Sequence, residues 1–459
     1  MLTVDFNNKA TLFHFIGIGG ISMSGLAELL LSEGFRVSGS DMAESELTDS
    51  LTRLGAHISF PQAASNINDD IDIVIYTAAI HEDNPELMEV RKRNIPALTR
   101  ADFLGQLMKR YKVSAAVAGT HGKTTTTSML SEILLKADTD PTLSIGGMLK
   151  SIGGNFRVGK QDFFVTEACE YTNSFLSFFP TVGVILNVDE DHLDFFKDLR
   201  DIQNSFHKFA ALLPDDGTLI INGETKGFDI VTEGLKCNIV TYGPDSRYDY
   251  YPTDISFNDL ACASFTLNHG GEAVGSISLK IPGEHNIGNA CAAAASAFAM
   301  GIDGKHILAA LSEFRGVDRR FQYKGSFNGV RVIDDYAHHP TEIAASLAAA
   351  KKCRYNKLWC VFQPHTYTRT KALLPEFAEV LSAADEVVLA DIYAARETDT
   401  LGVSSKILAD EISARGHNAR YFDSFEKIEN FLKENCIHGD LLITMGAGDV
   451  YKIGDRLLK

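Results

Sequence analysis

Short apolar runs that end in glycine alternate with helix-period segments along most of this chain, and this alternation limits the possible folds more than any other feature. The run TLFHFIGI is followed by a helical pattern over about residues 21–32 and then by the apolar run FRVSGS. A strand, a helix and a second strand in this order form a βαβ unit with parallel strands. The sequence therefore predicts an α/β fold built on mostly parallel sheets.

The alternation divides the chain into three blocks, and 459 residues suit about three domains. Residues 1–111 are predicted to form a small, doubly wound, Rossmann-like domain. Residues 112–315 open with the strand KVSAAVAG and run past an alanine-rich helix. Residues 316–459, entered through the polar stretch FRGVDRRFQ, are predicted to be Rossmann-like again, with strands in VRVIDDYA, LWCVFQP, DEVVLADIY and LLITMGAGD.

The charge and cysteine content exclude several classes of protein. The net charge of −17 repels nucleic-acid phosphates and anionic membrane surfaces, so we expect no nucleic-acid partner. No stretch approaches the about 20 apolar residues of a membrane span, and the first residues lack the pattern of a secretory signal, so we expect neither membrane insertion nor export. The seven cysteines are scattered and never spaced C-x-x-C, which favours a reducing, cytoplasmic location.

A first glycine turn, with Gly17, Gly19 and Gly20, follows a predicted strand and opens a helix, and Asp41 lies near the end of the next strand. Glycines allow the backbone to approach a diphosphate, and the helix N-terminus offers unpaired N–H groups to it. The third glycine of the dinucleotide pattern G-x-G-x-x-G would fall at Ser22, so a diphosphate other than that of a nicotinamide cofactor is favoured. A nicotinamide-dependent dehydrogenase and a turn that serves only packing stay open.

A second glycine turn, AGTHGKTTT, lies between the strand KVSAAVAG and a predicted helix, in the order of a phosphate loop. Backbone N–H groups of such a turn cradle phosphate oxygens, Lys123 supplies a positive charge, and the Thr124 hydroxyl can coordinate Mg²⁺. Its spacing G-x-x-G-K-T is shorter than that of standard P-loops, which argues against a standard GTPase and not against nucleotide binding. The predicted nucleotide-binding residues of this turn are Gly119, Thr120, His121, Gly122, Lys123, Thr124 and Thr125.

Carboxylates at the ends of neighbouring strands would complete a magnesium site, because Mg²⁺ prefers oxygen ligands. Glu167 ends the strand DFFVTE. An acidic turn after the strand VGVILNV carries Asp189, Glu190, Asp191, His192 and Asp194. A solvated loop is the alternative interpretation of this turn.

In the third block, polar residues gather where a strand ends and a helix should begin, with Arg320 before the strand and Asp335 and His338 in DDYAHHP after it. Neither H-E-x-x-H nor G-x-S-x-G occurs, so a zinc protease and a serine hydrolase lack their signatures. Arg369 in HTYTRT can form a two-pronged pair with a carboxylate, and a surface arginine is the alternative.

Nine strings of the chain resemble, in the same order, those of the Mur ligases of bacterial cell-wall synthesis: GIGGISMSGLAE, AGTHGKTTTTSML, EACEYTNSFL, NVDEDHLD, GEHNIGNACAA, FRGVDRRFQ, DDYAHHPTE, QPHTYTRTKAL and YAARE. The resemblance covers essentially the whole chain. It implies an N-terminal domain that binds a UDP-sugar, a central P-loop ATPase domain, and a C-terminal domain that closes over the active site with the amino acid.

The resemblance also implies roles for individual residues. The residues implied as catalytic are Lys123, His192, His338 and Arg369. Those implied for Mg²⁺ are Thr124, Glu167 and His192. Those implied for ATP, beyond the phosphate loop, are His285, Asn286, Asn289, Arg320 and Asp335. Those implied for the amino acid are His338, His365 and Arg369. Those implied for the UDP moiety are Gly17, Gly19, Gly20, Ser22, Ser40 and Asp41.

The implied reaction is ATP-dependent amide formation in a monomer or homodimer. The lactyl carboxylate of UDP-N-acetylmuramate is phosphorylated to an acyl phosphate, and the amine of L-alanine then displaces phosphate. The strings QPHTYTRT and YAARE favour this branch over a recycling branch that attaches a ready-made peptide. A non-catalytic nucleotide sensor would lack one of Lys123, Glu167 and His192, and all three are present.

Three positions bear on this resemblance. Cys169 stands where relatives commonly have the acidic residue of E-A-D-E-S, and Thr366 replaces the arginine of Q-P-H-R-Y. We expect the second change to bear on amino-acid specificity, because a phosphate or carboxylate would go without this arginine or bind Arg369 instead. Several sister ligases carry a carbamylated lysine after the metal histidine; Lys208 lies in that neighbourhood, and its sequence context assigns it no such role.

Overall fold

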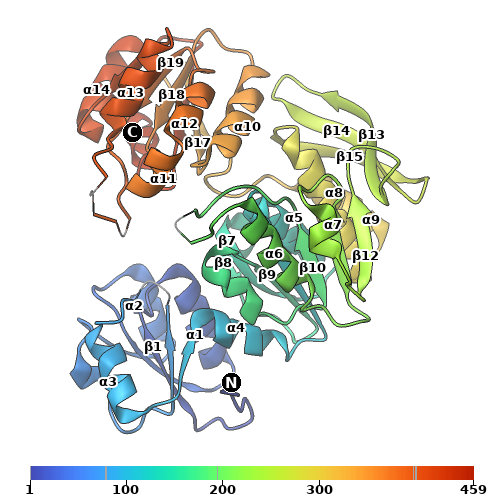
Figure 1. Ribbon diagram of the computed structural model, residues 1–459, viewed down its shortest axis with the longest axis vertical. Coiled ribbons are helices and arrows are strands. Elements are labelled where there is room, and N and C mark those ends of the chain that lie inside the picture. The colour runs from blue at the N-terminus through green and yellow to red at the C-terminus, as the bar shows by residue number, and fades with distance from the viewer. Residues whose placement is uncertain (1, 78–79, 194, 396, 399–400) are drawn as a thin grey trace. The chain divides into compact units, whose positions relative to one another are not determined.

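The computed structural model describes residues 2–77, 80–193, 195–395, 397–398 and 401–459, and it confirms the α/β class with mostly parallel sheets (Figure 1). The chain folds as two compact units. Unit 1 comprises Met1–Val188, Gln203–Val240 and Ala294–Asp303. Unit 2 comprises Asp189–Ile202, Thr241–Ala293 and Gly304–Lys459.

Unit 1 begins with a five-stranded parallel sheet in the order β3-β2-β1-β4-β5. Its strands are β1 (Leu12–Ile16), β2 (Arg36–Ser40), β3 (His57–Ser59), β4 (Ile73–Tyr76) and β5 (Ala97–Thr99). Its helices are α1 (Ile21–Ser32), α2 (Glu46–Arg53), α3 (Pro85–Arg93), α4 (Arg100–Met108) and the short η1 (Ala64–Asn66). The helix predicted over residues 21–32 is α1, with the same bounds.

Side chains of β1 alternate between two apolar layers, as the two-residue period of a strand requires. Phe13 and Phe15 face the ring of Phe103 on α4, with ring centroids 5.8 and 6.3 Å apart. Leu12 and Ile16 pack in the cluster of Val90 on α3. The strand order reverses between β1 and β4, and ligands of doubly wound sheets bind at the carboxyl ends of the strands at such a point.

The second sheet of unit 1 runs in the order β8-β7-β9-β6-β10-β11-β12 and is parallel around β6, with only β8 shown antiparallel to its neighbour. Its strands are β6 (Val113–Ala118), β7 (Thr142–Leu149), β8 (Gly154–Arg157), β9 (Phe163–Glu167), β10 (Val182–Ile185), β11 (Thr218–Asn222) and β12 (Asn238–Tyr242). Its helices are α5 (Lys123–Lys136), α6 (Leu199–Ala210), α7 (Phe228–Thr232) and the short η2 (Lys150–Ile152) and η3 (Tyr171–Ser177).

Close packing joins the two sheets within unit 1. Gly25 of α1 lies against the ring of Phe156 on β8, where a side chain would clash. Gly105 of α4 lies against the backbone carbonyl of Ser177 in η3 and leaves no room for a Cβ. The N-terminal sheet is therefore held to the nucleotide-binding sheet through α1 and α4.

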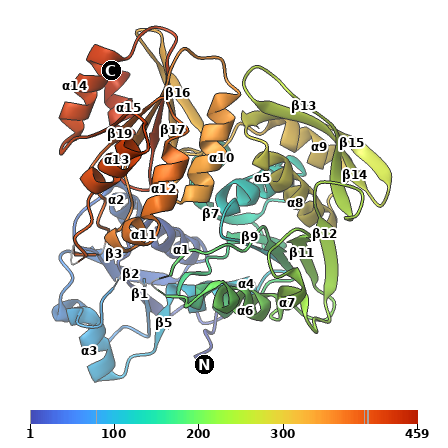
Figure 2. The same ribbon diagram turned by 45° about the horizontal axis from the view of Figure 1, so that its top comes forward.

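Unit 2 contains an antiparallel extension that the sequence did not predict. Its strands are β13 (Tyr250–Phe257), β14 (Cys262–His269) and β15 (Glu272–Pro282), joined as long hairpins (Figure 2). The helices α8 (His285–Ala299) and α9 (Gly304–Glu313) follow, and α9 packs on β15.

The third sheet lies in unit 2 and has the order β16-β17-β21-β18-β19-β20, with β16 antiparallel to β17 and the other pairs parallel. Its strands are β16 (Gln322–Phe327), β17 (Val330–Asp335), β18 (Leu358–Phe362), β19 (Glu386–Leu389), β20 (Ala419–Tyr421) and β21 (Leu441–Met445). Its helices are α10 (Pro340–Lys351), α11 (Tyr367–Ala372), α12 (Leu374–Leu381), α13 (Ser405–Ala414), α14 (Phe425–Asn435) and α15 (Tyr451–Leu457).

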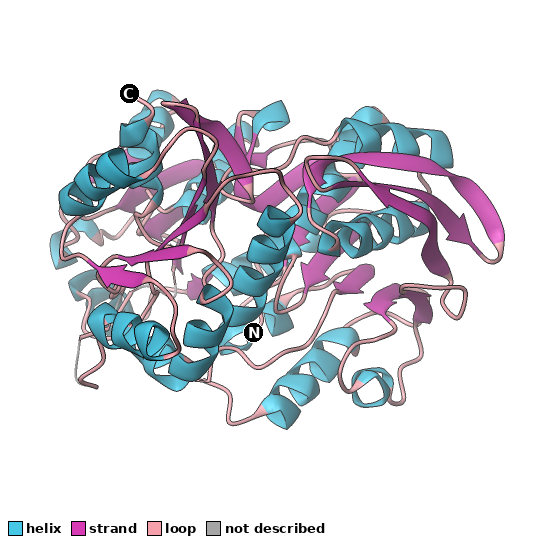
Figure 3. Cartoon of the chain, turned by 90° about the horizontal axis from the view of Figure 1, so that it is seen from above, coloured by secondary structure: helices cyan, strands magenta, loops and turns pink. Residues whose placement is uncertain are grey.

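Two hydrophobic cores cover the two faces of this third sheet. Figure 3 shows helices flanking the strands nearest the C-terminus. Leu347 of α10 and Phe377 of α12 belong to one core, and Ile428 of α14 and Ile453 of α15 belong to the other. The four strands predicted for this block are present as β17, β18, β19 and β21. Among the described residues, no helix has the length and apolar character that crossing a bilayer requires.

Candidate active site

The phosphate loop of unit 1 turns between β6 and α5 on two glycines in the left-handed region, Gly119 with φ +144° and Gly122 with φ +85°. Asn187, which follows β10, fixes this turn from the neighbouring strand. Its side-chain oxygen accepts the His121 N–H at 2.8 Å, its amide nitrogen donates to the His121 carbonyl at 3.0 Å, and its own carbonyl accepts the Thr120 N–H at 3.2 Å. The loop is thus preorganised by three hydrogen bonds from one residue.

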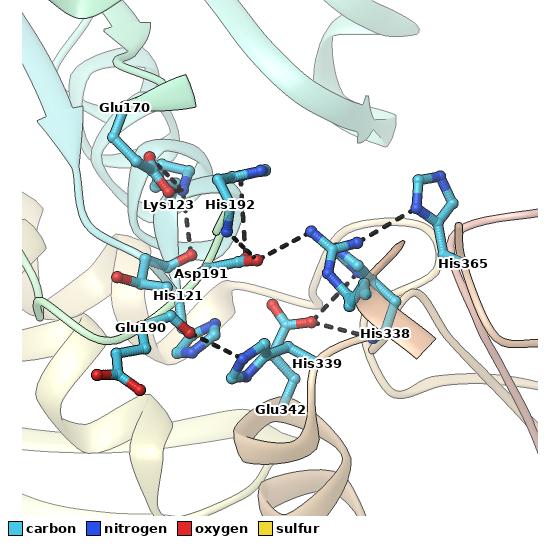
Figure 4. A network of polar contacts seen from close by, with 12 residues as sticks. His121, Lys123, Glu170, Glu190, Asp191, His192, His338, His339, Glu342 and His365 are labelled. Carbon is cyan, nitrogen blue, oxygen red and sulfur yellow. Dashed lines mark hydrogen bonds and ion pairs between the residues drawn. The ribbon is translucent and has the colours of Figure 1, made fainter. Parts of the chain in front are cut away.

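Lys123 is the first residue of α5, and its ammonium group is held inside the loop (Figure 4). It donates to both carboxylate oxygens of Glu170, at 3.2 and 3.0 Å, and to the backbone carbonyls of Gly119 and Thr120. Burial would lower the pKa of Lys123, but Glu170, together with Cys169 and Glu167, outweighs burial and raises it above its ordinary value. Lys123 therefore stays charged where phosphate oxygens would approach.

Thr124 and Glu167 form the oxygen-rich end of the same loop. The Thr124 hydroxyl donates to Glu167 Oε2 at 3.2 Å, and the Gly146 N–H donates to Glu167 Oε1 at 2.5 Å. A hydroxyl and a carboxylate beside a phosphate loop are ligands that fit Mg²⁺, which keeps several waters and needs few protein ligands. No cluster of three or more acidic, histidine or cysteine ligands occurs among the described residues, and Mg²⁺ binding by Thr124 and Glu167 stays a prediction.

The first glycine turn lies at the carboxyl end of β1, as predicted. Gly17 has φ +82°, and its N–H and that of Ile18 donate to the Ser40 carbonyl. Asp41 accepts the Gly19 N–H at 2.7 Å, so its carboxylate braces the turn from the end of β2. Gly20 caps α1 without a side-chain acceptor, and this leaves the first turn of the helix suited to an anion.

Ser40 and Ser22 differ in what their side chains can reach. The Ser22 side chain is half-buried in the first turn of α1. The Ser40 side chain is fully buried and donates to Glu86 Oε2 at 2.5 Å. Burial raises the pKa of Glu86, against the hydrogen bonds that it accepts from Ser40 and Asn66. Binding of a UDP moiety by Ser40 stays a prediction, and the structure shows its hydroxyl supporting Glu86.

Unit 2 brings the predicted amino-acid-binding residues together (Figure 4). Arg369 donates to Asp191 Oδ1 at 2.9 Å, and its other terminal nitrogen lies 3.2 Å from His365 Nδ1. The His365 and His338 rings lie 5.7 Å apart. The Arg369 and Asp191 side chains are only 11% and 10% exposed, so this ion pair is largely shielded from water.

Burial and neighbouring charges shift the pKa values of the acidic and histidine side chains in this cluster. Burial would raise the pKa of Asp191, but Arg369 and the neighbouring histidines outweigh it and hold the pKa well below its ordinary value. Burial lowers the pKa of His338 to about 4, although Glu342, 3.3 Å from its Nδ1, favours the charged form. Burial also lowers the pKa of His365 to about 4, assisted by His338 and Arg369. Both imidazoles are therefore neutral at neutral pH.

The predicted adenine-side residues lie at the start of α8. Asn286 and Asn289 are buried; the Asn289 amide donates to Asn286 Oδ1 at 2.9 Å and the Asn286 amide to the Pro282 carbonyl at 2.8 Å. His285 is exposed, and the adenine-side role of the three residues stays a prediction.

Asp335 is the last residue of β17, and Arg320 stands two residues before β16. Asp335 is buried, accepts the Ser346 hydroxyl at 2.5 Å and the Ala337 N–H at 3.0 Å, and has a pKa raised by burial to about 6. Arg320 lies over the Tyr336 ring at 5.1 Å.

The residues that bear on the departures from the family strings have distinct surroundings. Thr366 adopts φ +66° and ψ +146°, unusual for a branched side chain, and caps α11 by accepting the Arg369 N–H. The exposed Lys208 lies on α6. Asp194 and Arg396, from the strings DEDHLD and YAARE, lie outside the described residues.

Two functional contacts had weak signals in the sequence. Glu170, the counter-ion of Lys123, stands three residues after Glu167 in the family-like string EACEYTNSFL, and its own residue pattern did not indicate this contact. Asn187 directly precedes the acidic turn at the end of β10, where a polar residue after an apolar strand was the available signal.

Comparisons with known proteins agree along the whole chain. Residues 12–112 match the model of the Mur ligase family catalytic domain, residues 117–297 that of the Mur ligase middle domain, and residues 319–448 that of the Mur ligase glutamate ligase domain. A protein of Agathobacter rectalis named UDP-N-acetylmuramate--L-alanine ligase is 57% identical over 459 residues, covering all of both chains.

Solved structures give the same result. The chain is similar to the UDP-N-acetylmuramate-alanine ligase of Thermotoga maritima, with a TM-score of 0.81 and 32% identity over 97% of this chain and 98% of that one. It is also similar to a murein peptide ligase of Psychrobacter arcticus, with a TM-score of 0.72 and 26% identity over 98% of each chain. By its sequence, its fold and its phosphate-loop geometry, this chain belongs to the Mur ligase family.

Proposed function

We propose that this chain joins L-alanine to UDP-N-acetylmuramate with hydrolysis of ATP, through an acyl phosphate, as a step of peptidoglycan precursor synthesis. The observation that carries the proposal is full-length identity of 57% to a relative named for this activity, together with an intact Lys123–Glu170 phosphate loop. Residues 1–111 would bind the UDP-sugar, residues 112–315 ATP, and residues 316–459 the amino acid.

The phosphate loop would carry the first chemical step. A carboxylate is a poor acyl donor, so its oxygen must first attack the γ-phosphate of ATP and release ADP. The loop N–H groups and the Lys123 ammonium would stabilise the negative charge that develops on the phosphate oxygens, and Lys123 is held for this by the Thr120 carbonyl and Glu170. Mg²⁺, when bound by Thr124, Glu167 and His192, would supply charge neutralisation on the phosphate oxygens.

The histidine and arginine cluster would carry the second step. The His338 Nδ1 lies 3.0 Å from the Tyr336 carbonyl and so carries the proton, which leaves Nε2 as an acceptor for an N–H of the incoming amine. Arg369 would bind a carboxylate or the acyl phosphate oxygens, with Asp191 holding the guanidinium in position. The amine then attacks the acyl carbon, phosphate leaves, and the amide forms.

The proposal also covers the location and the partners of the chain. A cytoplasmic location fits the seven cysteines, all of which are free. A monomer or homodimer that binds no nucleic acid and does not insert into membranes stays a prediction.

The test is release of phosphate from ATP and Mg²⁺ in the presence of UDP-N-acetylmuramate, with alanine, glycine, serine or the tripeptide L-Ala-γ-D-Glu-diaminopimelate added separately. Alanine-dependent release is the expected result, and the Lys123→Ala variant should lose it while it retains UDP-sugar binding. Release with the tripeptide alone would move the chain to the recycling branch, and silence with every acceptor would refute ligase activity.

A further inference from the structure

Arg100 is a cation of unit 1 that neither the fold nor the proposed chemistry uses. It is the first residue of α4 and directly follows β5, so it lies at the carboxyl edge of the first sheet. The glycine turn after β1 lies at the same edge, because all strands of this sheet are parallel. The guanidinium and the Cys169 side chain influence each other electrostatically, which places Arg100 beside the segment that carries Glu170.

The neighbouring carboxylates are engaged elsewhere. Asp102, in the first turn of α4, accepts the Thr99 hydroxyl at 2.6 Å on one oxygen and the Ser177 hydroxyl at 2.7 Å on the other. Glu170 gives both of its oxygens to Lys123. Among the residues that the structure describes, none makes a hydrogen bond or an ion pair with the Arg100 guanidinium.

A partly buried arginine without a counter-ion lowers the stability of the ligand-free protein. Burial lowers the pKa of Arg100, which shows that its charge is partly removed from water without a counter-ion that compensates. Arginine is the side chain best suited to take up two oxygens of a carboxylate or phosphate at once. A bound oxyanion would remove the penalty.

The position of Arg100 is also fixed. The Thr99 and Ser177 hydroxyls join α4 to η3 through Asp102, and Gly105 packs directly on the Ser177 carbonyl. The N-terminal end of α4 therefore cannot shift freely against the segment after β9. Arg100 therefore lies at the sheet edge that would bind UDP and beside the segment that carries Glu170, the partner of Lys123.

We propose that Arg100 binds an oxyanion of the UDP-sugar and positions the substrate between its uridine end and its reacting carboxylate. This inference rests on the proposed function, since it takes UDP-N-acetylmuramate as the ligand. Two groups of that substrate have the required chemistry, the diphosphate and the lactyl carboxylate. UDP-N-acetylglucosamine distinguishes between these two groups, because it has the diphosphate and lacks the lactyl group.

The experiment measures the affinity of the full chain for each of the two UDP-sugars by calorimetry without ATP. The variants are Arg100→Gln, the charge-keeping Arg100→Lys, and the control Arg93→Gln, which removes an exposed guanidinium paired with Glu89 on α3. Arg100→Gln should weaken binding of UDP-N-acetylmuramate by about 10- to 100-fold, Arg100→Lys should weaken it less, and Arg93→Gln should leave it unchanged.

Binding of UDP-N-acetylglucosamine shows which of the two substrate groups contacts Arg100. An equal loss for UDP-N-acetylglucosamine would place the diphosphate on Arg100, and a loss confined to UDP-N-acetylmuramate would place the carboxylate there. An affinity for UDP-N-acetylmuramate within twofold of wild type in Arg100→Gln would overturn the inference. Should Arg100→Gln fail to fold, unchanged binding by Arg100→Lys would overturn it equally, because a lysine cannot reproduce the two-pronged contact. Absence of binding by the wild-type chain would instead refute the proposed function.

Discussion

The ion pair between Lys123 and Glu170 gives the sharpest prediction about this structure. The two side chains are 17% and 3% exposed and their charged atoms lie 3.0 Å apart, so each charge depends on the other for its stability. Removing one partner of a buried pair typically costs about 3–5 kcal/mol, because the remaining charge is left without compensation. The Glu170→Gln variant should lower stability by about 3 kcal/mol, at the low end of this range, because Lys123 keeps the carbonyls of Gly119 and Thr120 as acceptors.

A double-mutant cycle isolates the interaction. Lys123→Met leaves the Glu170 carboxylate buried and should also cost about 3 kcal/mol, whereas the double variant leaves no uncompensated charge. The double variant should therefore be about 2 kcal/mol more stable than the sum of the two single effects predicts, a coupling typical of residues in direct contact.

The suitable assay is native-state hydrogen exchange of the α5 amides, because it reports the free energy of local opening of one element in a chain of several domains. The cycle compares wild type, the two single variants and the double variant under the same conditions. Additivity within about 0.5 kcal/mol would refute the reasoning that Glu170 is the counter-ion that keeps Lys123 charged in the loop.

Further predictions concern the neutral histidines, the Asn187 hydrogen bonds and the Arg369–Asp191 ion pair. Because His338 and His365 have folded-state pKa values of about 4, below the ordinary value of 6.5, the unfolded chain binds more protons between these values. Stability is therefore retained above pH 6.5 and lost as pH falls towards 4, by about 2 kcal/mol per histidine at pH 5, and His338→Gln should flatten part of this loss in thermal unfolding. Asn187→Ala removes two side-chain hydrogen bonds from the phosphate loop and should weaken ATP binding by about 2 kcal/mol, roughly 30-fold, in a direct titration; an unchanged affinity would show that the loop does not need Asn187. Asp191→Asn removes the charge that orients Arg369 and should lower kcat by at least about tenfold with UDP-sugar affinity unchanged, whereas a rise in KM alone would point to a role in binding.

Local patterns predicted the elements whose ends carry strong signals. The helix α1 begins after a glycine turn and ends before Gly34, and its predicted bounds agree with the structure. The strand β18, LWCVF, is a continuous apolar run and is buried along its whole length, as expected of a strand covered on both faces. The hairpins of β13 to β15 were not predicted, although Ile277, Leu279 and Ile281 of β15 alternate with exposed residues in the period of a strand; β13, by contrast, ends in five exposed residues that give no such period.

Contacts made over long sequence separations were beyond the reach of single-sequence reasoning. Arg369 was a candidate, but its partner Asp191 lies 178 positions away and was one of five polar residues in an acidic turn. Ser40 was expected at the ligand, and its hydrogen bond to the buried Glu86, 46 positions away, had no signal in the sequence. Arg100 belongs to no sequence motif. Only the structure makes it a candidate, because no counter-ion lies among the described residues around it.

The central claim is that the substrate carboxylate is phosphorylated before the amide forms, and isotope transfer tests it most directly. UDP-N-acetylmuramate labelled with oxygen-18 in its lactyl carboxylate is incubated with ATP, Mg²⁺, L-alanine and the full chain, and the released phosphate is examined by mass spectrometry. The account predicts that one labelled oxygen moves from the carboxylate to each phosphate released. Alanine-dependent phosphate without the label would contradict it, because the carboxylate oxygen would then never have attacked the γ-phosphate.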